Sequence, residues 1–189
     1  MHNTFVFIRH AKTLVDNKTP IENWILTQEG NKQALELLNV KEINDVDLLF
    51  SSNEDKAYLT IKPLADKLSK KISKVKDLGE IKRPNSEKLT SKQYEEMKVK
   101  IFQDLDYTQL NWETANSALN RFKKAVQEID FKYENKKILI CAHGTVMTLY
   151  FAFLQNKLND LFSRWHGLEF GALGIVKDFK VLKDIVKEV

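Results

Sequence analysis

The sequence is poor in the residues that mark disulfide-rich, fibrous and membrane-spanning proteins. Of its 189 residues, one is cysteine, three are proline and six are glycine. A single cysteine, Cys141, excludes an internal disulfide framework and fits a reducing compartment, so we expect a cytoplasmic protein. No stretch approaches the roughly 18 apolar residues of a membrane span. The short apolar run near the start is broken by Arg9 and is too brief for a signal-peptide core, so we expect neither secretion nor a membrane span.

The sequence also lacks a strong excess of one charge. Its 30 basic and 26 acidic residues give a formal net charge of +4, which favours anionic partners mildly and does not indicate nucleic acid. Lysine pairs such as 70–71 and 136–137 are typical of solvated surface. With 43% hydrophobic and 30% charged residues the composition is that of an ordinary globular protein, and its length suits one domain spanning residues 1–189.

Arginine is scarce, because only four of the 30 basic residues are of this type: Arg9, Arg83, Arg121 and Arg164. Arginine offers a planar fork that grips phosphate or carboxylate with two hydrogen bonds, whereas lysine is a point charge. A lysine-rich sequence that still places Arg9 beside His10 indicates anion recognition at this point.

Short apolar or β-branched runs alternate with amphipathic helical patterns along the sequence. The strand candidates are residues 4–8, 46–50, 72–75, 137–142 and 173–176. The helix candidates are residues 33–38, 55–69, 91–102 and 117–133. This alternation predicts an α/β protein, a single three-layer α/β/α domain with a mostly parallel central sheet, in which ligands gather at the carboxyl ends of the strands. Residues 82–91 and 104–113 are predicted to be irregular and are candidates for a lid.

Two predicted strands end in the same way, with a histidine that is followed by a turn into a helical segment. The segments are FVFIRHAKT, which contains His10, and ILICAHGTV, which contains His143. A helix amino end offers unpaired N–H groups and a partial positive charge, and it therefore binds phosphate readily. For one histidine alone, a hydrogen-bonded structural role would be an equally good interpretation. Two histidines placed alike favour a shared anion site at one sheet edge.

The order of several short motifs resembles that of the histidine phosphatase superfamily, also called the phosphoglycerate mutase-like family. The motifs are Arg9-His10, Leu26-Thr27-Gln28-Glu29-Gly30, Ser51-Ser52, Leu78-Gly79-Glu80, Glu113-Thr114 with the later Arg121, and His143-Gly144. Each is common alone, but together they span most of the chain. The resemblance implies a phosphoglycerate mutase-like fold. It also implies a phosphatase, because the mutases of the family tend to be longer.

The resemblance implies a covalent mechanism that runs through a phosphohistidine. His10, as a neutral imidazole, would attack phosphorus in line, and water would then hydrolyse the phosphoenzyme. Arg9 and His143 would neutralise charge on the equatorial oxygens, with His143 protonated when phosphate is bound. The backbone N–H groups of Gly144 and Thr145 would bind the same oxygens.

Glu80 is the catalytic acid that the resemblance implies. It would donate a proton to the leaving alkoxide and later take one from the attacking water. We expect partial burial to raise its pKa for this role. Taken alone, a glutamate between Gly79 and Ile81 would be interpreted as an exposed loop residue, so the assignment depends on the resemblance.

The sequence departs from the family pattern in the expected phosphate pocket. Lys56 stands where the family carries an arginine, which keeps a positive charge and loses the two-bond geometry. Asp16 or Asn17 takes the place of a family asparagine, and Arg83 is either a substrate contact or a surface cation. Family landmarks beyond the acid are missing, so the expected substrate is no more specific than a small phosphorylated metabolite or a phosphoprotein.

Other phosphate chemistries find no support in the sequence. We expect no metal and no cofactor, because His10 and His143 lack the spacings of metal ligands. A cysteine phosphatase that used Cys141 would need an arginine six residues later, where Met147 stands, and serine-hydrolase and P-loop motifs are absent. Two alternatives stay open: a phosphate-binding module that lost turnover through Lys56, and a mutase-type phosphotransferase. The oligomeric state stays unknown.

Overall fold

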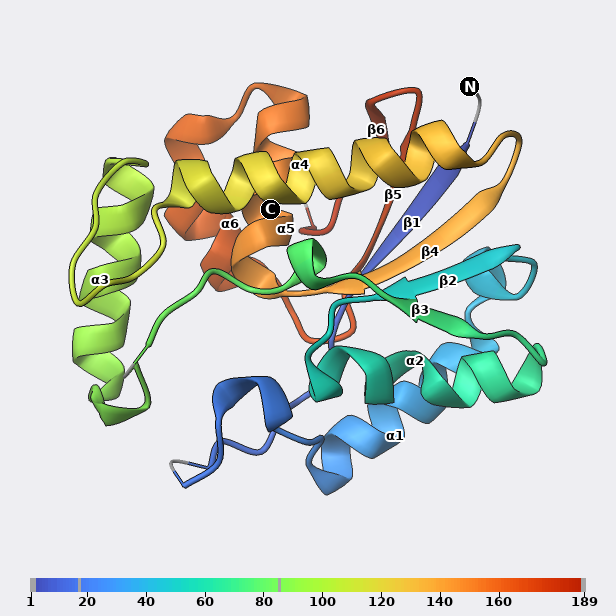
Figure 1. Ribbon diagram of the computed structural model, residues 1–189, viewed down its shortest axis with the longest axis horizontal. Coiled ribbons are helices and arrows are strands. Elements are labelled where there is room, and N and C mark those ends of the chain that lie inside the picture. The colour runs from blue at the N-terminus through green and yellow to red at the C-terminus, as the bar shows by residue number, and fades with distance from the viewer. Residues whose placement is uncertain (1–2, 17, 85, 188–189) are drawn as a thin grey trace.

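The computed structural model, which describes residues 3–16, 18–84 and 86–187, is built on one six-stranded sheet (Figure 1). The strands are β1 (Thr4–Arg9), β2 (Leu48–Ser51), β3 (Ile72–Lys74), β4 (Lys137–Ala142), β5 (Leu173–Lys177) and β6 (Lys180–Lys183), in the spatial order β3-β2-β4-β1-β5-β6. The pairs β3–β2, β2–β4 and β4–β1 are parallel, whereas β1–β5 and β5–β6 are antiparallel. The predicted mostly parallel sheet is therefore confirmed.

Helices cover both faces of this sheet. They are α1 (Gln28–Glu36), α2 (Asp55–Lys67), α3 (Ser91–Gln103), α4 (Ala115–Lys132), α5 (Gly144–Gln155) and α6 (Leu161–Gly167). In Figure 1, α1 and α2 lie below the sheet, α4, α5 and α6 lie above it, and α3 stands at the side. Short 3-10 helices occupy the connections: η1 (Ile21–Asn23), η2 (Leu37–Asn39), η3 (Lys41–Ile43), η4 (Lys76–Leu78), η5 (Ser86–Lys88) and η6 (Leu158–Asp160). Within the described residues, no helix is both long and apolar enough to cross a membrane.

The two helical layers bury alternate residues of the strands, because side chains of a strand point to opposite faces in turn. On β1, Phe5 and Phe7 pack into the cluster beneath α4 and α5, whereas Val6 and Ile8 pack into the cluster that includes α2. A strand buried on both faces needs a continuous apolar run, which is the pattern that predicted it.

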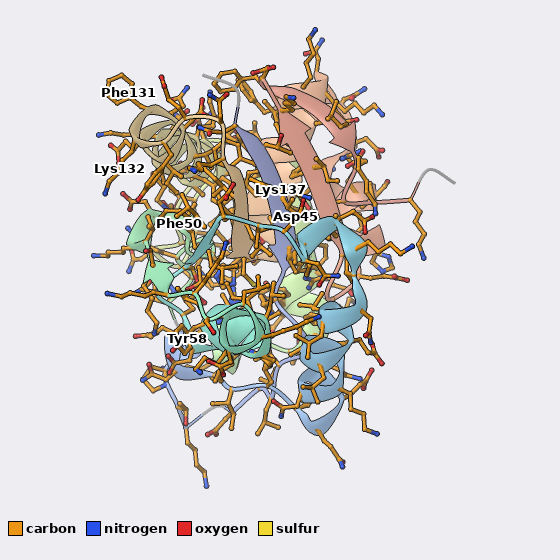
Figure 2. All side chains as sticks on the ribbon, turned by 90° about the vertical axis from the view of Figure 1, so that its right-hand side faces the viewer. Asp45, Phe50, Tyr58, Phe131, Lys132 and Lys137 are labelled. Atoms are coloured by element: carbon orange, nitrogen blue, oxygen red, sulfur yellow. The ribbon has the colours of Figure 1, made fainter. Side chains whose placement is uncertain are left out.

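The amino end of the sheet differs chemically from the apolar middle. Lys137, the first residue of β4, donates a hydrogen bond of 2.5 Å to Asp45, which precedes β2, and the two side chains lie together in Figure 2. Asp45 is largely exposed, with 72% of its side chain accessible. This end of the sheet therefore carries a charged pair that is in contact with solvent.

The structure departs from the predicted elements at three places. Helix α1 begins at Gln28, before the predicted residue 33, because the Thr27 side chain caps it by accepting the N–H of Gly30. Strand β6 was missed because the β5–β6 turn places Asp178 and Phe179 at φ 49° and 60°, where glycine or asparagine is the usual signal. Helix α6 has only seven residues, too few to show a helical period.

Candidate active site

The two histidines of the strand ends meet at the carboxyl edge of the sheet. Strands β1 and β4 are parallel neighbours in which Arg9 is paired with Ala142, and the N–H of His10 donates to the Ala142 carbonyl at 2.9 Å. His10 and His143 therefore leave the sheet side by side, with ring centroids 5.1 Å apart. The structure brings together the pair that sequence analysis placed at one anion site.

His10 is held as a neutral imidazole with one defined tautomer. Its Nδ1 lies 2.9 Å from the Ala11 carbonyl oxygen, which can only accept, so Nδ1 carries the proton and Nε2 keeps a lone pair. Burial lowers the pKa of His10 well below its usual range, and the neighbouring charges of His143 and Lys56 lower it further. A neutral ring with an open Nε2 is the form that a nucleophile requires.

Arg9 lies against the start of α5. Its Nη1 donates to the Leu168 carbonyl, and its guanidinium carbon lies 4.1 Å from the centre of the Phe170 ring. A Cβ on Gly144 would lie 3.3 Å from that guanidinium, so glycine at this position allows the close approach. The Nε of Arg9 is buried and has no hydrogen-bond partner among the described residues.

His143 is fully buried and turns its two nitrogens to different surroundings. Its Nε2 lies 2.7 Å from the Ser52 hydroxyl and 3.2 Å from Glu54 Oε1. Its Nδ1 is buried, and no described residue hydrogen-bonds to it. Burial lowers the pKa of His143 to about 4, and the carboxylate of Glu54 opposes this shift. The ring is therefore neutral at pH 7 in this structure, and its expected protonation with phosphate bound stays a prediction.

Glu80 faces the amino end of α5. Its Oε2 accepts the N–H of Thr145 at 3.0 Å, and its Oε1 accepts the N–H of Ile81 at 2.8 Å. The Thr145 N–H, expected to bind phosphate, thus donates to a carboxylate of the protein.

The expected rise in the pKa of Glu80 is wrong. Burial does raise it, but the positive charges of Lys98 and Arg83 and the N–H of Thr145 outweigh burial, and the pKa lies well below the usual value of 4.5. Lys98 gives the largest of these lowering contributions. The expectation from the sequence included the effect of burial on the pKa of Glu80. It did not include the charge of Lys98, because the sequence does not show that this lysine is buried in the site.

Arg121 and Glu113 clamp the segment that carries Glu80. The guanidinium of Arg121 donates to both carboxylate oxygens of Glu113 at 2.8 Å. It also donates to the carbonyl oxygens of Asp77, Gly79 and Glu80 at 2.9, 2.8 and 2.8 Å. The ion pair of Glu113 and Arg121 therefore holds the backbone of the segment that carries Glu80 in place.

Lys56, expected to replace a family arginine, lies in the first turn of α2. It is only 2% exposed, and its Nζ donates to Glu54 Oε2 and, at 2.9 Å, to the Ile21 carbonyl. The point charge is thus fixed by a buried carboxylate and a carbonyl. Arg83, the other predicted cation, has its guanidinium carbon 5.5 Å from the Tyr94 ring centre.

A cavity of about 480 Å³ opens beside part of this cluster. Its lining includes Arg9, His10, Lys56, Arg83, Tyr94 and Phe170. Asn17, a predicted substrate contact, lies outside the described residues. In the part of the chain that the structure describes, no three His, Cys, Asp or Glu side chains gather as metal ligands would. The cavity combines a histidine ring, cations and aromatic walls.

A comparison with family models decides the family. The model of the histidine phosphatase superfamily (branch 1) matches residues 5–177, which include both histidines and the acid. The chain belongs to this superfamily. Among curated proteins, none matches the sequence significantly.

Solved structures similar to this histidine phosphatase superfamily member share its fold at low identity. Native mycobacterial glucosyl-3-phosphoglycerate phosphatase is 16% identical, with a TM-score of 0.80 over 99% of this chain and 100% of that chain. Bacillus stearothermophilus YhfR is 20% identical, with a TM-score of 0.76 over 96% and 95% of the two chains. A mutant phosphoserine phosphatase from Entamoeba histolytica, in complex with phosphoserine, is 17% identical, with a TM-score of 0.73 over 92% and 89%. The phosphoglycerate mutase-like fold is thereby confirmed.

Sequence reasoning missed two charged residues of this superfamily member's site. Glu54 stands in a polar run and gave no signal, yet it is only 8% exposed. Lys98 is fully buried, donates to the Thr145 hydroxyl and lies 5.3 Å from the Tyr94 ring centre. It did leave a signal, because it stands on the face of α3 that also carries Tyr94 and Ile101 at helical spacing.

Proposed function

We propose that this protein is a phosphomonoesterase that acts through a phosphohistidine on His10. The observation that carries the proposal is the lone pair that His10 keeps on Nε2, in a ring 5.1 Å from that of His143, together with two buried polar atoms, Arg9 Nε and His143 Nδ1, that have no hydrogen-bond partner among the described residues. Buried polar groups are normally satisfied. A tetrahedral anion bound there would accept from Arg9 and from His143, which donates from Nδ1 once its ring is protonated, and would present phosphorus to His10.

In the first step, His10 Nε2 forms a bond to phosphorus while the bond from phosphorus to the leaving oxygen breaks. Arg9 and His143 stabilise the charge on the equatorial oxygens. Lys56 lines the cavity and adds a positive charge. The products of this step are a phosphohistidine and an alcohol.

Glu80 supplies the proton that the leaving oxygen needs. A bound phosphate brings negative charge beside Glu80, so we expect its pKa to rise from the low value of the free protein when substrate binds. In the second step the ionised Glu80 takes a proton from water as the water attacks phosphorus, and His10 is released. No residue of this scheme requires a metal, and we expect activity to be independent of one.

The substrate is proposed to be a small phosphorylated metabolite or an exposed phosphoryl group of a protein. A cavity of about 480 Å³ lies in the range of small-molecule sites. Two of the similar structures are named as phosphatases of glucosyl-3-phosphoglycerate and of phosphoserine, which favours the metabolite.

A phosphate-binding module without turnover is the second candidate. In the free protein the pKa of Glu80 lies well below its usual value, so the carboxyl group lacks the proton that the leaving oxygen needs, whereas phosphate binding does not require this proton. The mutase alternative has no comparable observation in its favour.

Hydrolysis of p-nitrophenyl phosphate in the presence of EDTA distinguishes the two candidates. We expect phosphate release by the wild type that is unchanged by the chelator. Absence of release, together with a melting temperature that still rises with added phosphate, would identify the binding module. Activity that disappears with EDTA would contradict metal independence.

A further inference from the structure

Glu54 is a buried carboxylate that contacts three other residues of the site. It lies between β2 and α2, and its Oε2 accepts a hydrogen bond from Lys56 Nζ. Its Oε1 accepts the backbone N–H of Glu80 at 2.7 Å and lies 3.2 Å from His143 Nε2. One side chain therefore contacts a lysine and a histidine of the proposed phosphate pocket as well as the backbone of Glu80.

The surrounding backbone leaves room for this carboxylate. A Cβ on Gly79 would lie 3.3 Å from Glu54 Oε1, closer than ordinary van der Waals contact. Glycine at position 79 thus lets the acid-bearing segment approach Glu54. The N–H of Glu54 also donates to the Ser52 hydroxyl at 3.2 Å, which fixes its backbone next to His143.

The charges around His143 determine what Glu54 can do. Acting on its ring are the carboxylates of Glu54 and Glu80 and the cations of Lys56 and Arg83, while His10 packs against it. A protonated imidazole donates from both nitrogens. On His143 the Nε2–H would point to Glu54 and Ser52, and Nδ1–H, which has no partner among the described residues, would be left for a ligand.

We propose that Glu54 is a positioning residue of the phosphate site, which holds the ammonium of Lys56 in place and stabilises the protonated form of His143. Anion binding and protonation of His143 then occur together. This inference rests on the proposed anion site and does not require turnover. Free His143 has its pKa lowered to about 4, so near pH 6 the proton must be taken up when the anion binds.

Sulfate is the probe for this coupling, because it is a tetrahedral dianion that does not titrate near neutral pH. If one proton is taken up, the sulfate affinity of the wild type falls about tenfold for each pH unit between pH 5 and 7. In Glu54→Gln the carboxylate partner of Nε2–H is lost, and we expect the affinity to change less than about threefold per unit. Calorimetric titration at each pH gives both slopes.

Asp55→Asn is the matched control. Asp55 is the neighbouring acid on α2, and its carboxylate pairs with Lys74 at 3.4 Å on the surface. The same loss of one charge at this position should leave the wild-type slope unchanged.

The wild type provides a measurement that does not depend on the folding of any variant. With ¹⁵N-labelled histidine, the two ring nitrogens of His143 should change from the neutral to the protonated pattern when sulfate binds at pH 6. A ring that stays neutral, or a Glu54→Gln slope equal to that of the wild type, would overturn the role of Glu54. Sulfate binding with the expected slope but without phosphate release would contradict the proposed function alone and support the role of Glu54.

Discussion

The two ends of the central sheet carry ion pairs of opposite character. At the amino end, Lys137 and Asp45 pair in solvent, with 26% and 72% of their side chains exposed. At the carboxyl end, Lys56 and Glu54 pair with only 2% and 10% exposed. A solvated pair contributes at most about 1 kcal/mol, whereas breaking a buried pair leaves an uncompensated charge that costs several kcal/mol.

The difference shows that the buried charges at the carboxyl end lower the stability of the fold. Burying Glu54, Lys56 and Lys98 desolvates three charges that apolar side chains could have replaced. Such burial strengthens the electrostatic field at the edge where His10 and His143 meet, because water is excluded there. The proposed catalysis therefore accounts for the buried charged residues at the carboxyl end. The charged residues at the amino end need only contact with water.

The largest expected effect comes from His10→Ala at the carboxyl end. We expect kcat for p-nitrophenyl phosphate to fall by about 10⁴-fold or more, because no other group can form the phosphoenzyme. Steady-state assays measure the loss. A decrease below about tenfold would mean that water attacks the substrate directly.

Arg121→Met tests the clamp that holds the acid. Loss of the Glu113 pair and of three carbonyl contacts should lower kcat about 100-fold through displacement of Glu80, and the free energy of unfolding by about 3 kcal/mol. Urea unfolding and steady-state kinetics measure the two effects. Lys124→Met, which removes an exposed partner of Glu128, is the control and should change neither. Unchanged activity in Arg121→Met would show that Glu80 does not need the clamp.

Lys98→Met tests the electrostatic control of Glu80. The pKa of Glu80 is lowered in the folded protein, so its ionised form adds stability above its unfolded pKa and loses it as pH falls through the folded pKa. Without the ammonium of Lys98 the folded pKa should rise, and this contribution should shrink. The alkaline limb of the profile of kcat against pH, where Glu80 loses its proton in the substrate complex, should move upward by about one unit. If this limb of the profile does not move, Lys98 does not control the pKa of Glu80.

Lys137→Met, at the amino end, should have the smallest effect. It breaks only the solvated pair with Asp45 and leaves the carboxyl end intact. We expect the free energy of unfolding to change by less than about 0.5 kcal/mol, with kcat unaltered. A change in kcat would show that the two ends are coupled, contrary to the comparison.

The sequence predicted the half of the site that contains the two histidines better than the half that contains Glu80. The short apolar runs predicted β1 and β4 correctly. The proximity of His10 and His143 followed, because neighbouring parallel strands end at one edge of the sheet. The acid half depends on packing between remote segments: Lys98 reaches Thr145 from α3, and Glu54 reaches the N–H of Glu80 from the connection between β2 and α2. No local pattern encodes such contacts, so the direction of the pKa shift of Glu80 could not be predicted.

Identification of the phosphorylated atom tests the central claim most directly. Rapid acid-free quenching during turnover, followed by peptide mass spectrometry and ³¹P NMR, should find an acid-labile, base-stable phosphoryl group on Nε2 of His10. The same treatment of His10→Ala should give no label. A phosphoryl group on any other residue, or active turnover without a phosphoenzyme, would contradict the account.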